Sequence, residues 1–296
     1  MMINLYRAEL QKIIGNRWVS GMLLWVFPIG ALGVVIFVAF LALLIQDFDS
    51  KFFNEPPLWT STMIGVWDFP TNILGQMFLI GLTAVTFAGE YQWGTWKNVL
   101  PRQRRTAVIL VKFLALGTLV VFAFALMAVF LGGGYGVIAK IAGIEYGPAL
   151  SPDVLIEFLK DFGLQASLAF FTVLITSVYA ALAAMFMRSI LGGVLVGLGI
   201  IIVEPVSSFI VVPISTLLEN EKLLHIIRFT PTYNVDNIRS LVRFDAPSLM
   251  FSWIFEANNL GDVHNSIGLS LLILTIWIVL GMGLIIWLFR RQDISS

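Results

Sequence analysis

Six long apolar runs, five of them free of charged residues, constrain this chain more than any other feature of its sequence. A helix rises about 1.5 Å per residue and the hydrocarbon core of a membrane is about 30 Å thick, so runs of roughly 20 residues predict membrane-spanning helices. The predicted spans are Trp18 to Ile45, Phe69 to Gly89, Phe113 to about Gly134, Phe162 to Met187, Ser189 to about Val212, and Ile267 to Phe289. Only 12% of the residues are charged, against about 25% in soluble domains. The sequence therefore predicts an all-α integral membrane protein in which residues 1–296 form a single transmembrane domain.

The basic residues are distributed unevenly between the two sides that six crossings define. Cytoplasmic segments of membrane proteins carry an excess of Lys and Arg. On the side of the two termini lie Arg7, Lys12, Arg17, Lys97, Arg102, Arg104, Arg105, Lys112, Arg188, Arg290 and Arg291. The two short loops on the other side hold only Lys51, Lys140 and Lys160. This bias predicts that both termini are cytoplasmic.

The connections between the spans differ in length. Only Met187, Arg188 and Ser189 join the fourth and fifth spans, which predicts a tight helical hairpin. The glycines of "GGVLVGLG", residues 192–199, are predicted to permit close helix packing or bending. The extracytoplasmic segment 213–265 contains apolar pieces too short to cross a bilayer and broken at prolines. These pieces predict either re-entrant or interfacial helices or a small folded outer cap, and the sequence leaves both interpretations open.

Residues 1–17 are predicted to form an amphipathic helix in the membrane surface. One face holds Ile3, Tyr6, Leu10 and Ile13, and the other holds Asn4, Arg7 and Gln11. The helix is interpreted either as a topological anchor or as an elbow helix that also contacts a cytoplasmic partner.

Residues 90–112 form the only sizeable loop on the predicted cytoplasmic side. Gly94 and Thr95 suit a change of direction after the second span, and Pro101 marks the end of a short surface helix. The arginines of this loop are explained by topology and by contact with anionic lipid head groups. Glu90 is not, because a carboxylate at the end of a span and next to arginines favours an electrostatic contact with another protein.

At these residues the sequence resembles the permease subunits of type-2 ABC exporters (ABC-2 permeases). Members of that family carry a Glu and a Lys before the first span, which here are Glu9 and Lys12. They also carry a Glu at the end of the second span, a Gly-Thr pair, a turn rich in Pro and Arg, and a Lys that opens the third span. The matching stretches are "EYQWGT", "LPRQRR" and Lys112, within residues 87–117. Trp93 and Trp96, which flank the Gly-Thr pair, depart from the family's pattern.

The resemblance implies that the loop is a coupling helix that docks on a separate ABC ATPase subunit of a bacterial plasma-membrane exporter. The residues implied in that contact are Glu90, Gly94, Thr95, Arg102, Arg104 and Arg105, with Arg7, Glu9 and Lys12 in the elbow helix. Six spans are half of the family's usual set, so the working unit is expected to hold two permease chains, identical or paralogous, and two ATPases. The chain has no G-x-x-x-x-G-K-[ST] motif. ATP and Mg are therefore expected on the partner, and this chain is expected to be neither an enzyme nor a cofactor-binding protein.

Several other chemistries find no support in the composition. The chain has no cysteine, and its two histidines, His225 and His264, both fall in the large outer segment, so neither a metal nor a haem site is expected. A net charge of zero gives no indication of nucleic-acid binding.

Glu204, followed by Pro205, is the one charged residue inside a predicted span, and charge at that depth is a functional hypothesis by default. Three interpretations are open. Glu204 caps a helix that breaks at Pro205, or it lines the transport path and attracts a cationic group, or it carries a proton. The last interpretation belongs to the main alternative function, an ion- or proton-coupled carrier or channel that acts alone. A membrane scaffold or sensor without transport activity is a third possibility.

Overall fold

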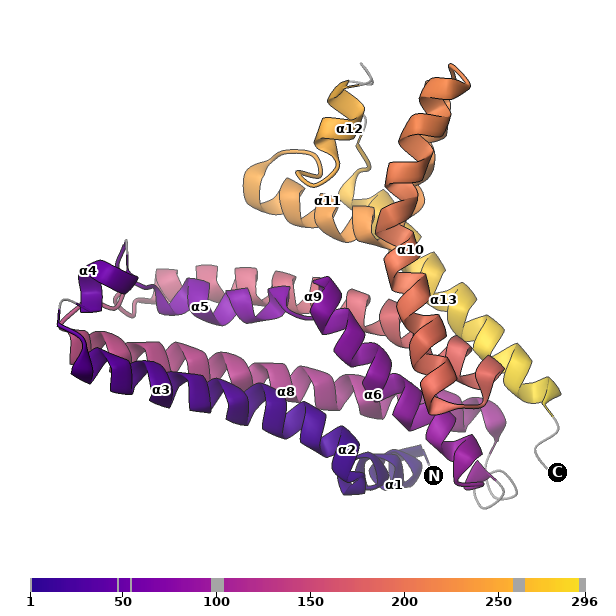
Figure 1. The fold of residues 1–296 in the computed structure, drawn as a ribbon, viewed down its shortest axis with the longest axis horizontal. Helices are drawn as coiled ribbons and strands as arrows, with labels where there is room; N and C mark the ends of the chain where they lie inside the picture. The colour runs from indigo at the N-terminus through magenta and orange to yellow at the C-terminus, as the bar shows by residue number, and fades with distance from the viewer. Residues whose placement is uncertain (1, 47, 54, 97–103, 258–263, 293–296) are drawn as a thin grey trace. The chain divides into compact units, whose positions relative to one another are not determined.

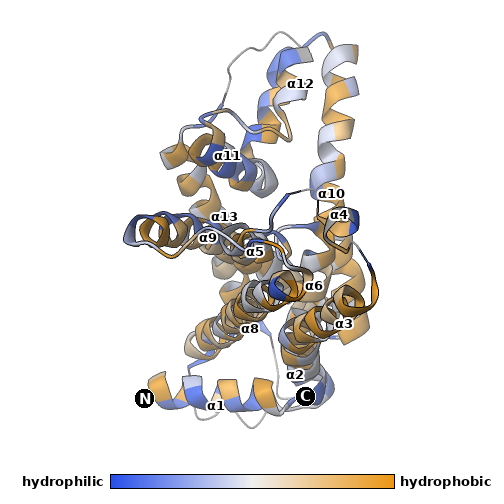
Figure 2. Ribbon diagram, turned by 90° about the vertical axis from the view of Figure 1, so that its left-hand side faces the viewer, coloured by the Kyte–Doolittle hydropathy of each residue, from blue (hydrophilic) through white to orange (hydrophobic). Residues whose placement is uncertain are grey.

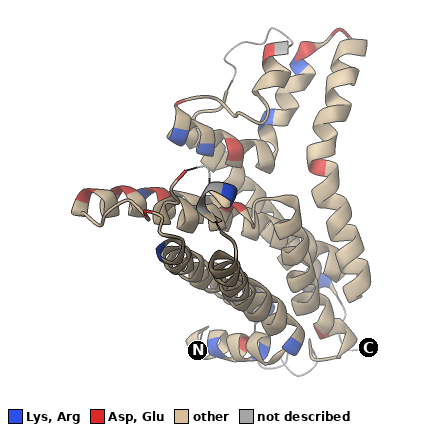
Figure 3. Ribbon diagram, turned by 60° about the vertical axis from the view of Figure 1, so that its left-hand side comes forward, with Lys and Arg blue, Asp and Glu red and all other residues tan. Residues whose placement is uncertain are grey.

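The backbone is helical over most of the residues that the structure, a computed structural model, describes: 2–46, 48–53, 55–96, 104–257 and 264–292 (Figure 1). Within these ranges there is no β-strand, and one isolated parallel bridge joins Leu58 and Gly147. Six helices are long and apolar enough to cross a membrane: Arg17–Leu44, Ile73–Gln92, Arg105–Ala142, Pro152–Met187, Ile190–Leu217 and Ile267–Arg291. Figure 2 shows their apolar character and Figure 3 the sparse charge along them. The described residues confirm the prediction of an all-α chain with six helices able to cross a membrane.

Three of the spans are longer than predicted. Helix α8 (Arg105–Ala142) begins before Phe113 and continues past Gly134, and α9 (Pro152–Met187) begins ten residues before Phe162. A prediction from uncharged runs alone underestimates the length of these helices, because a helix can continue through charged residues. Helix α8 instead ends at a glycine: Gly143 has a φ of +71°, the left-handed conformation that terminates helices. Helix α10 (Ile190–Leu217) likewise continues past Val212.

The first span contains an irregular segment that the sequence analysis did not anticipate. Helix α2 (Arg17–Ser20) leads into a π-helical stretch η1 (Gly21–Ile29), and α3 (Gly30–Leu44) completes the span. Pro28 lies within the π-helical stretch. A proline lacks an N–H and clashes with the carbonyl one turn earlier, so a locally wider helix is a physical response to it.

The N-terminal helix α1 (Met2–Gly15) is buried along a side that shares only Ile13 with the apolar face predicted to lie in the membrane surface. Leu5, Glu9 and Ile13 are buried, whereas Ile3 is 67% exposed. The face that packs against the protein therefore contains a carboxylate, because Glu9 finds a cationic partner there.

The chain divides into two compact units, Met1–Asn72 with Leu110–Phe170 and Ile73–Ile109 with Phe171–Ser296. Aromatic rings fill the first unit. Phe27 contacts Phe69 and Phe124 at centroid distances of 5.3 and 5.0 Å, and Trp67 lies 5.5 Å from Phe162. These rings bury a large apolar area between the first, third and fourth spans.

Between α3 and α6 the first unit contains three short helices, α4 (Phe48–Phe52), α5 (Trp59–Gly65) and η2 (Val66–Asp68). The backbone N–H of Trp59 donates to Gly147 O at 2.9 Å, and its indole N–H donates to Pro148 O at 2.8 Å. The Tyr146 hydroxyl donates to Gly132 O. Burial raises the pKa of Tyr146, so its hydroxyl remains a neutral donor in this bond.

In the second unit α6 (Ile73–Gln92) packs on α10, and α11 (Pro231–Phe244) packs on α13 (Ile267–Arg291). Between α10 and α13 the chain also forms η3 (Glu221–Phe229) and α12 (Ser252–Ala257). These short helices share a core with Val211 and Val212 of α10, made of Leu224, Ile227, Tyr233, Phe251, Ile254 and Phe255. The described helices between α10 and α13 are therefore packed around an apolar core to which α10 also contributes.

The connection between α9 and α10 is the predicted tight hairpin. Helix α9 ends at Met187 and α10 begins at Ile190, with Arg188 in a left-handed conformation (φ 50°) between them. The Ser189 hydroxyl caps α10 by accepting from the backbone N–H of Gly192 at 3.4 Å. A Cβ at Gly193 would lie 2.9 Å from Ala184 Cα, so the two backbones approach as closely as predicted for these glycines.

We expect Gly193→Ala to destabilise the protein by about 1–3 kcal/mol, because the added methyl group meets backbone atoms that cannot rotate away. Gly199→Ala is the matched control on the same helix, since nothing lies within 4 Å of a Cβ there. Thermal unfolding of the detergent-purified variants measures both. Equal midpoints for Gly193→Ala and Gly199→Ala would show that the hairpin is not tightly packed.

Candidate functional site

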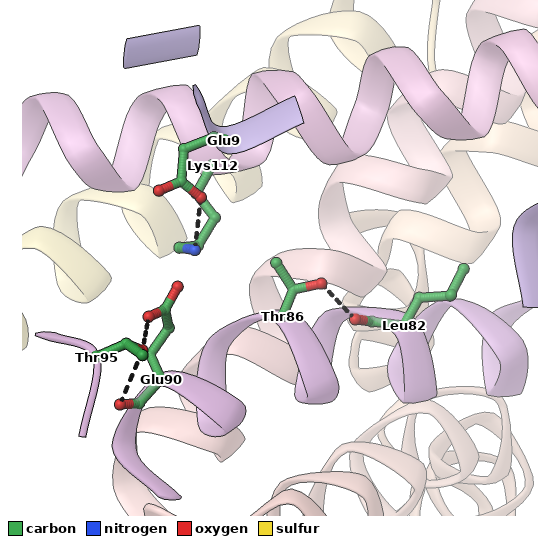
Figure 4. Close-up of polar contacts among 6 residues, drawn as sticks. All are labelled: Glu9, Leu82, Thr86, Glu90, Thr95 and Lys112. Carbon is green, nitrogen blue, oxygen red and sulfur yellow. Dashed lines mark hydrogen bonds and ion pairs between the residues drawn. The ribbon is translucent and has the colours of Figure 1, made fainter. Parts of the chain in front are cut away.

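The turn after α6 is held by a buried carboxylate (Figure 4). Glu90 is only 2% exposed, and its carboxylate accepts a hydrogen bond from the Thr95 hydroxyl. The Thr95 N–H donates to Glu90 O at 3.1 Å, and Gly94 between them has a φ of +63°, which favours glycine. Glu90, Gly94 and Thr95 thus form one closed turn at the end of the second span.

This burial changes the physical interpretation of Glu90. Glu90 was predicted to make an electrostatic contact at the protein surface, but its carboxylate accepts a hydrogen bond from the Thr95 hydroxyl. A role for Glu90 in ATPase coupling stays a prediction, and the geometry gives it a positioning role for the turn.

The two tryptophans that flank the Gly-Thr pair have different environments. Trp96 is 1% exposed, and its ring lies 4.6 Å from Phe289 of α13 and 5.7 Å from Tyr91 of α6. Trp93 is 54% exposed. Trp96 therefore anchors the loop in an aromatic cluster, while Trp93 remains on the surface.

Arg105, the first residue of α8, caps the end of α13. Its Nη1 donates to Phe289 O at 2.8 Å, Arg290 O at 3.1 Å and Gln292 O at 2.9 Å. The last carbonyls of a helix have no partner within the helix and carry partial negative charge, so a guanidinium satisfies them well. Arg105 was predicted as a docking residue, and the structure shows it bound to its own chain.

Gln292 connects two more helices to the C-terminal end of α13. It accepts from the Tyr91 hydroxyl of α6, and its Nε2 donates to Met185 O of α9 at 3.2 Å. Tyr91, Trp96, Arg105, Phe289 and Gln292 together form a C-terminal hub that joins the ends of α6, α9 and α13 to the start of α8. All five residues belong to the second unit.

The other predicted basic residues are placed as follows. Arg102 lies outside the described residues, Arg104 and Arg7 are exposed, and Lys12 is partly buried. Arg7 and Lys12 belong to the first unit and Arg104 to the second. The charge available to a partner on the described part of the loop is that of Arg104.

Glu9 and Lys112 form a buried ion pair within the first unit (Figure 4). Lys112 Nζ lies 2.8 Å from Glu9 Oε2, and the side chains are 1% and 5% exposed. Each residue was singled out from the sequence, but nothing in a single sequence pairs residues 103 positions apart. The pair fixes α1 against α8, because separating it leaves a buried charge without its counter-ion.

Glu204 lies on an unbroken helix, so the predicted break at Pro205 is wrong. Helix α10 continues through Pro205 and Pro213 to Leu217, as prolines in spanning helices are tolerated where neighbouring groups compensate. Glu204 Oε1 accepts from the backbone N–H of Thr232 at 2.7 Å. The carboxylate therefore caps the N-terminus of α11, a different helix from the one expected.

A buried amide network between α10 and α13 was not predicted from the sequence. Its members are Arg228, Asn234, Asn237, Asn265 and Ser270. Asn265 Oδ1 accepts from Arg228 Nε and Nη2 at 3.0 and 2.7 Å, and its Nδ2 donates to Asn234 Oδ1 at 2.9 Å. Asn237 Nδ2 donates to Asn265 O at 2.7 Å and Ser270 Oγ at 3.1 Å. Two asparagines three residues apart on an otherwise amphipathic helix were the available signal.

Comparison with models of known protein families gives no match, and comparison with curated proteins gives no significant match.

We expect Lys112→Met to lower the free energy of unfolding by about 3–5 kcal/mol, because Glu9 stays buried without this partner. Adding Glu9→Gln should restore much of the loss, since the double variant buries no charge at this position. Chemical unfolding in detergent measures both variants, with Lys160→Met at an exposed site as the control. A single variant as stable as the wild type would contradict the assignment of the pair as a structural lock.

Proposed function

We propose that this chain is the membrane-spanning permease subunit of an ATP-driven ABC exporter, and that the loop at residues 90–112 docks a separate ATPase subunit. The observation that carries the proposal is the bracing of this loop at both ends. The C-terminal hub holds its start and Arg105, and the Glu9–Lys112 pair holds its continuation into α8.

A docking loop of this kind must transmit movement from a soluble partner to spanning helices. Ordinary connecting loops are mobile and make few buried contacts. This loop instead contains a buried carboxylate, a buried tryptophan and an arginine that holds three carbonyls. Such contacts at the described ends of the loop, residues 90–96 and 104–112, suit a part that transmits movement to the spanning helices, which supports the exporter assignment.

The remaining features fit the same proposal. Helix α1 acts as the elbow helix, with Arg7 exposed for contact with lipid or the ATPase and Glu9 turned inward. Both termini face the cytoplasm of a bacterial plasma membrane. The exposed apolar faces of α3, α10 and α13 contact lipid and a second permease chain, which completes the dimeric transport path. The helices η3, α11 and α12 form an outer cap, since they share an apolar core to which α10 also contributes.

The stand-alone carrier is the less favoured alternative. A coupling carboxylate must be free to exchange its ion or proton, whereas Glu204 holds the N-terminus of α11 at 2.7 Å. Another buried carboxylate in a described span, Glu90, lies at the end of α6 and accepts a hydrogen bond from the Thr95 hydroxyl, so it too is engaged within the protein.

We expect Arg104→Glu to abolish binding of the ATPase subunit while leaving the permease folded, because Arg104 is exposed. The tagged chain would be isolated in mild detergent from cells that also express the candidate ATPase. Co-purified vanadate-sensitive ATPase activity is the readout. Arg243→Glu, an equally exposed arginine on α11, is the matched control and should retain the activity.

Absence of any ATPase from the wild-type preparation would overturn the proposal. Retention of the ATPase by Arg104→Glu would leave the exporter assignment in place and remove Arg104 from the docking surface.

A further inference from the structure

One face of α13 carries an ordered series of exposed side chains. Its members, spaced at i, i+4, i+7 and i+11, are Leu280, Leu284, Trp287 and Arg291. This spacing places them on one side of a helix. The three apolar side chains are 47–67% exposed, and Arg291 is exposed as well. Toward the C-terminus the series therefore changes from aliphatic to aromatic to cationic.

The series is as long as one leaflet of a bilayer is deep. From Leu280 to Arg291 the helix rises about 16 Å, and half of the hydrocarbon core is about 15 Å. Tryptophan is enriched at the level of the lipid head groups. When Trp287 lies at that level, the two leucines lie among the acyl chains and Arg291 lies at the phosphates.

Two guanidinium groups end the series, and uncharged partners hold both in place. Arg291 Cζ lies 4.2 Å from the centroid of the Trp287 ring, and Arg290 Nη2 donates to Thr106 Oγ1 at 2.8 Å. An arginine side chain has several N–H donors, and stacking on a ring uses none of them. Both groups therefore keep donors for an anion.

The positive charge at this end of α13 is not balanced within the described part of the chain. No described carboxylate forms an ion pair with Arg104, Arg290 or Arg291. The terminal carbonyls of α13 do not require these charges, because Arg105 already donates to three carbonyls there. Like charges that are brought together repel one another, so this arrangement favours a bound anion.

We propose that this face of α13 binds an anionic phospholipid. Arg290 and Arg291 bind its phosphate, Trp287 lies at the level of its glycerol, and Leu280 and Leu284 contact an acyl chain. A phospholipid fits better than a free phosphate or an acidic protein, since neither of these reaches the leucines in the hydrocarbon layer. The site needs no ATPase, so this inference goes beyond the proposed function.

The test is a lipid titration of the full chain, purified in a maltoside detergent and followed by native mass spectrometry. The probe is dioleoylphosphatidylglycerol, which is anionic. Dioleoylphosphatidylcholine has the same acyl chains without net charge, and we expect its first molecule to bind about tenfold more weakly. An excess of inorganic phosphate should not displace the bound phosphatidylglycerol, because phosphate makes no contact with the apolar part of the site.

Arg290→Gln combined with Arg291→Gln is the decisive variant. Both side chains are exposed, and Arg105 binds only backbone carbonyls at this point, so the fold should persist. We expect phosphatidylglycerol binding to weaken by about tenfold or more, because two attractive charges are lost. The matched control, Lys222→Gln combined with Arg243→Gln, removes the same charge from exposed positions elsewhere and should bind like the wild type.

A substitution of Trp287 keeps the test decisive if the double arginine variant does not fold. Trp287→Leu retains an apolar side chain but removes the ring that holds Arg291. We expect it to weaken phosphatidylglycerol binding by about twofold to fivefold. Trp25→Leu, at an exposed tryptophan of the first span, is its control.

Saturable phosphatidylglycerol binding that is weakened by the arginine variant or by Trp287→Leu, and not by the controls, supports the site. The proposal is overturned if phosphatidylcholine binds as tightly, if inorganic phosphate displaces the lipid, or if the folded variants bind phosphatidylglycerol like the wild type. In the last case, loss of co-purified ATPase from the arginine variant would assign the two arginines to a protein partner. The titration contains no ATPase, so a failure of the exporter assignment leaves its outcome unaffected.

Discussion

In a hydrocarbon layer no water is available to the peptide groups, so every backbone N–H and C=O must find its partner within the protein. This constraint produces the six long helices, and it also governs the polar side chains that remain inside them. Thr86 donates to Leu82 O one turn earlier at 2.7 Å, and Thr83 meets Ser177 across two helices at 3.2 Å. The buried polar contacts described above obey the same rule, and they are therefore the places where one helix is fixed to another.

The spans were predictable because their signal is local: about 20 apolar residues exceed what any soluble helix requires. Their ends were not, since α8 and α9 run on through residues whose charge is compatible with a helix outside the membrane. The π-helical stretch around Pro28 and the continuity of α10 through Pro205 also escaped prediction. A proline signals a local disturbance, but the neighbours that accommodate it are set by tertiary packing.

The candidate site was predictable in its residues and not in its contacts. Glu9, Glu90, Arg105 and Lys112 were all singled out from their types and positions, yet they were expected at a surface. Three of them are engaged instead with residues far away in sequence, and Arg105 reaches carbonyls 184 or more positions distant. A charged residue next to a span is either an exposed group that binds a partner or a buried group that bonds to its own chain. Only the fold distinguishes the two.

The two-residue connection between α9 and α10 also limits how these helices can move. An extended chain covers at most about 3.6 Å per residue, so the joined ends cannot part by more than about 10 Å. The two helices are held together at this connection, and the close contact between Gly193 and Ala184 lies near it. Helix α10 has 28 residues and is about 42 Å long. A tilt of about 5° at this connection would therefore displace its far end by roughly 4 Å, a lever that magnifies small movements at one membrane surface into larger ones at the other.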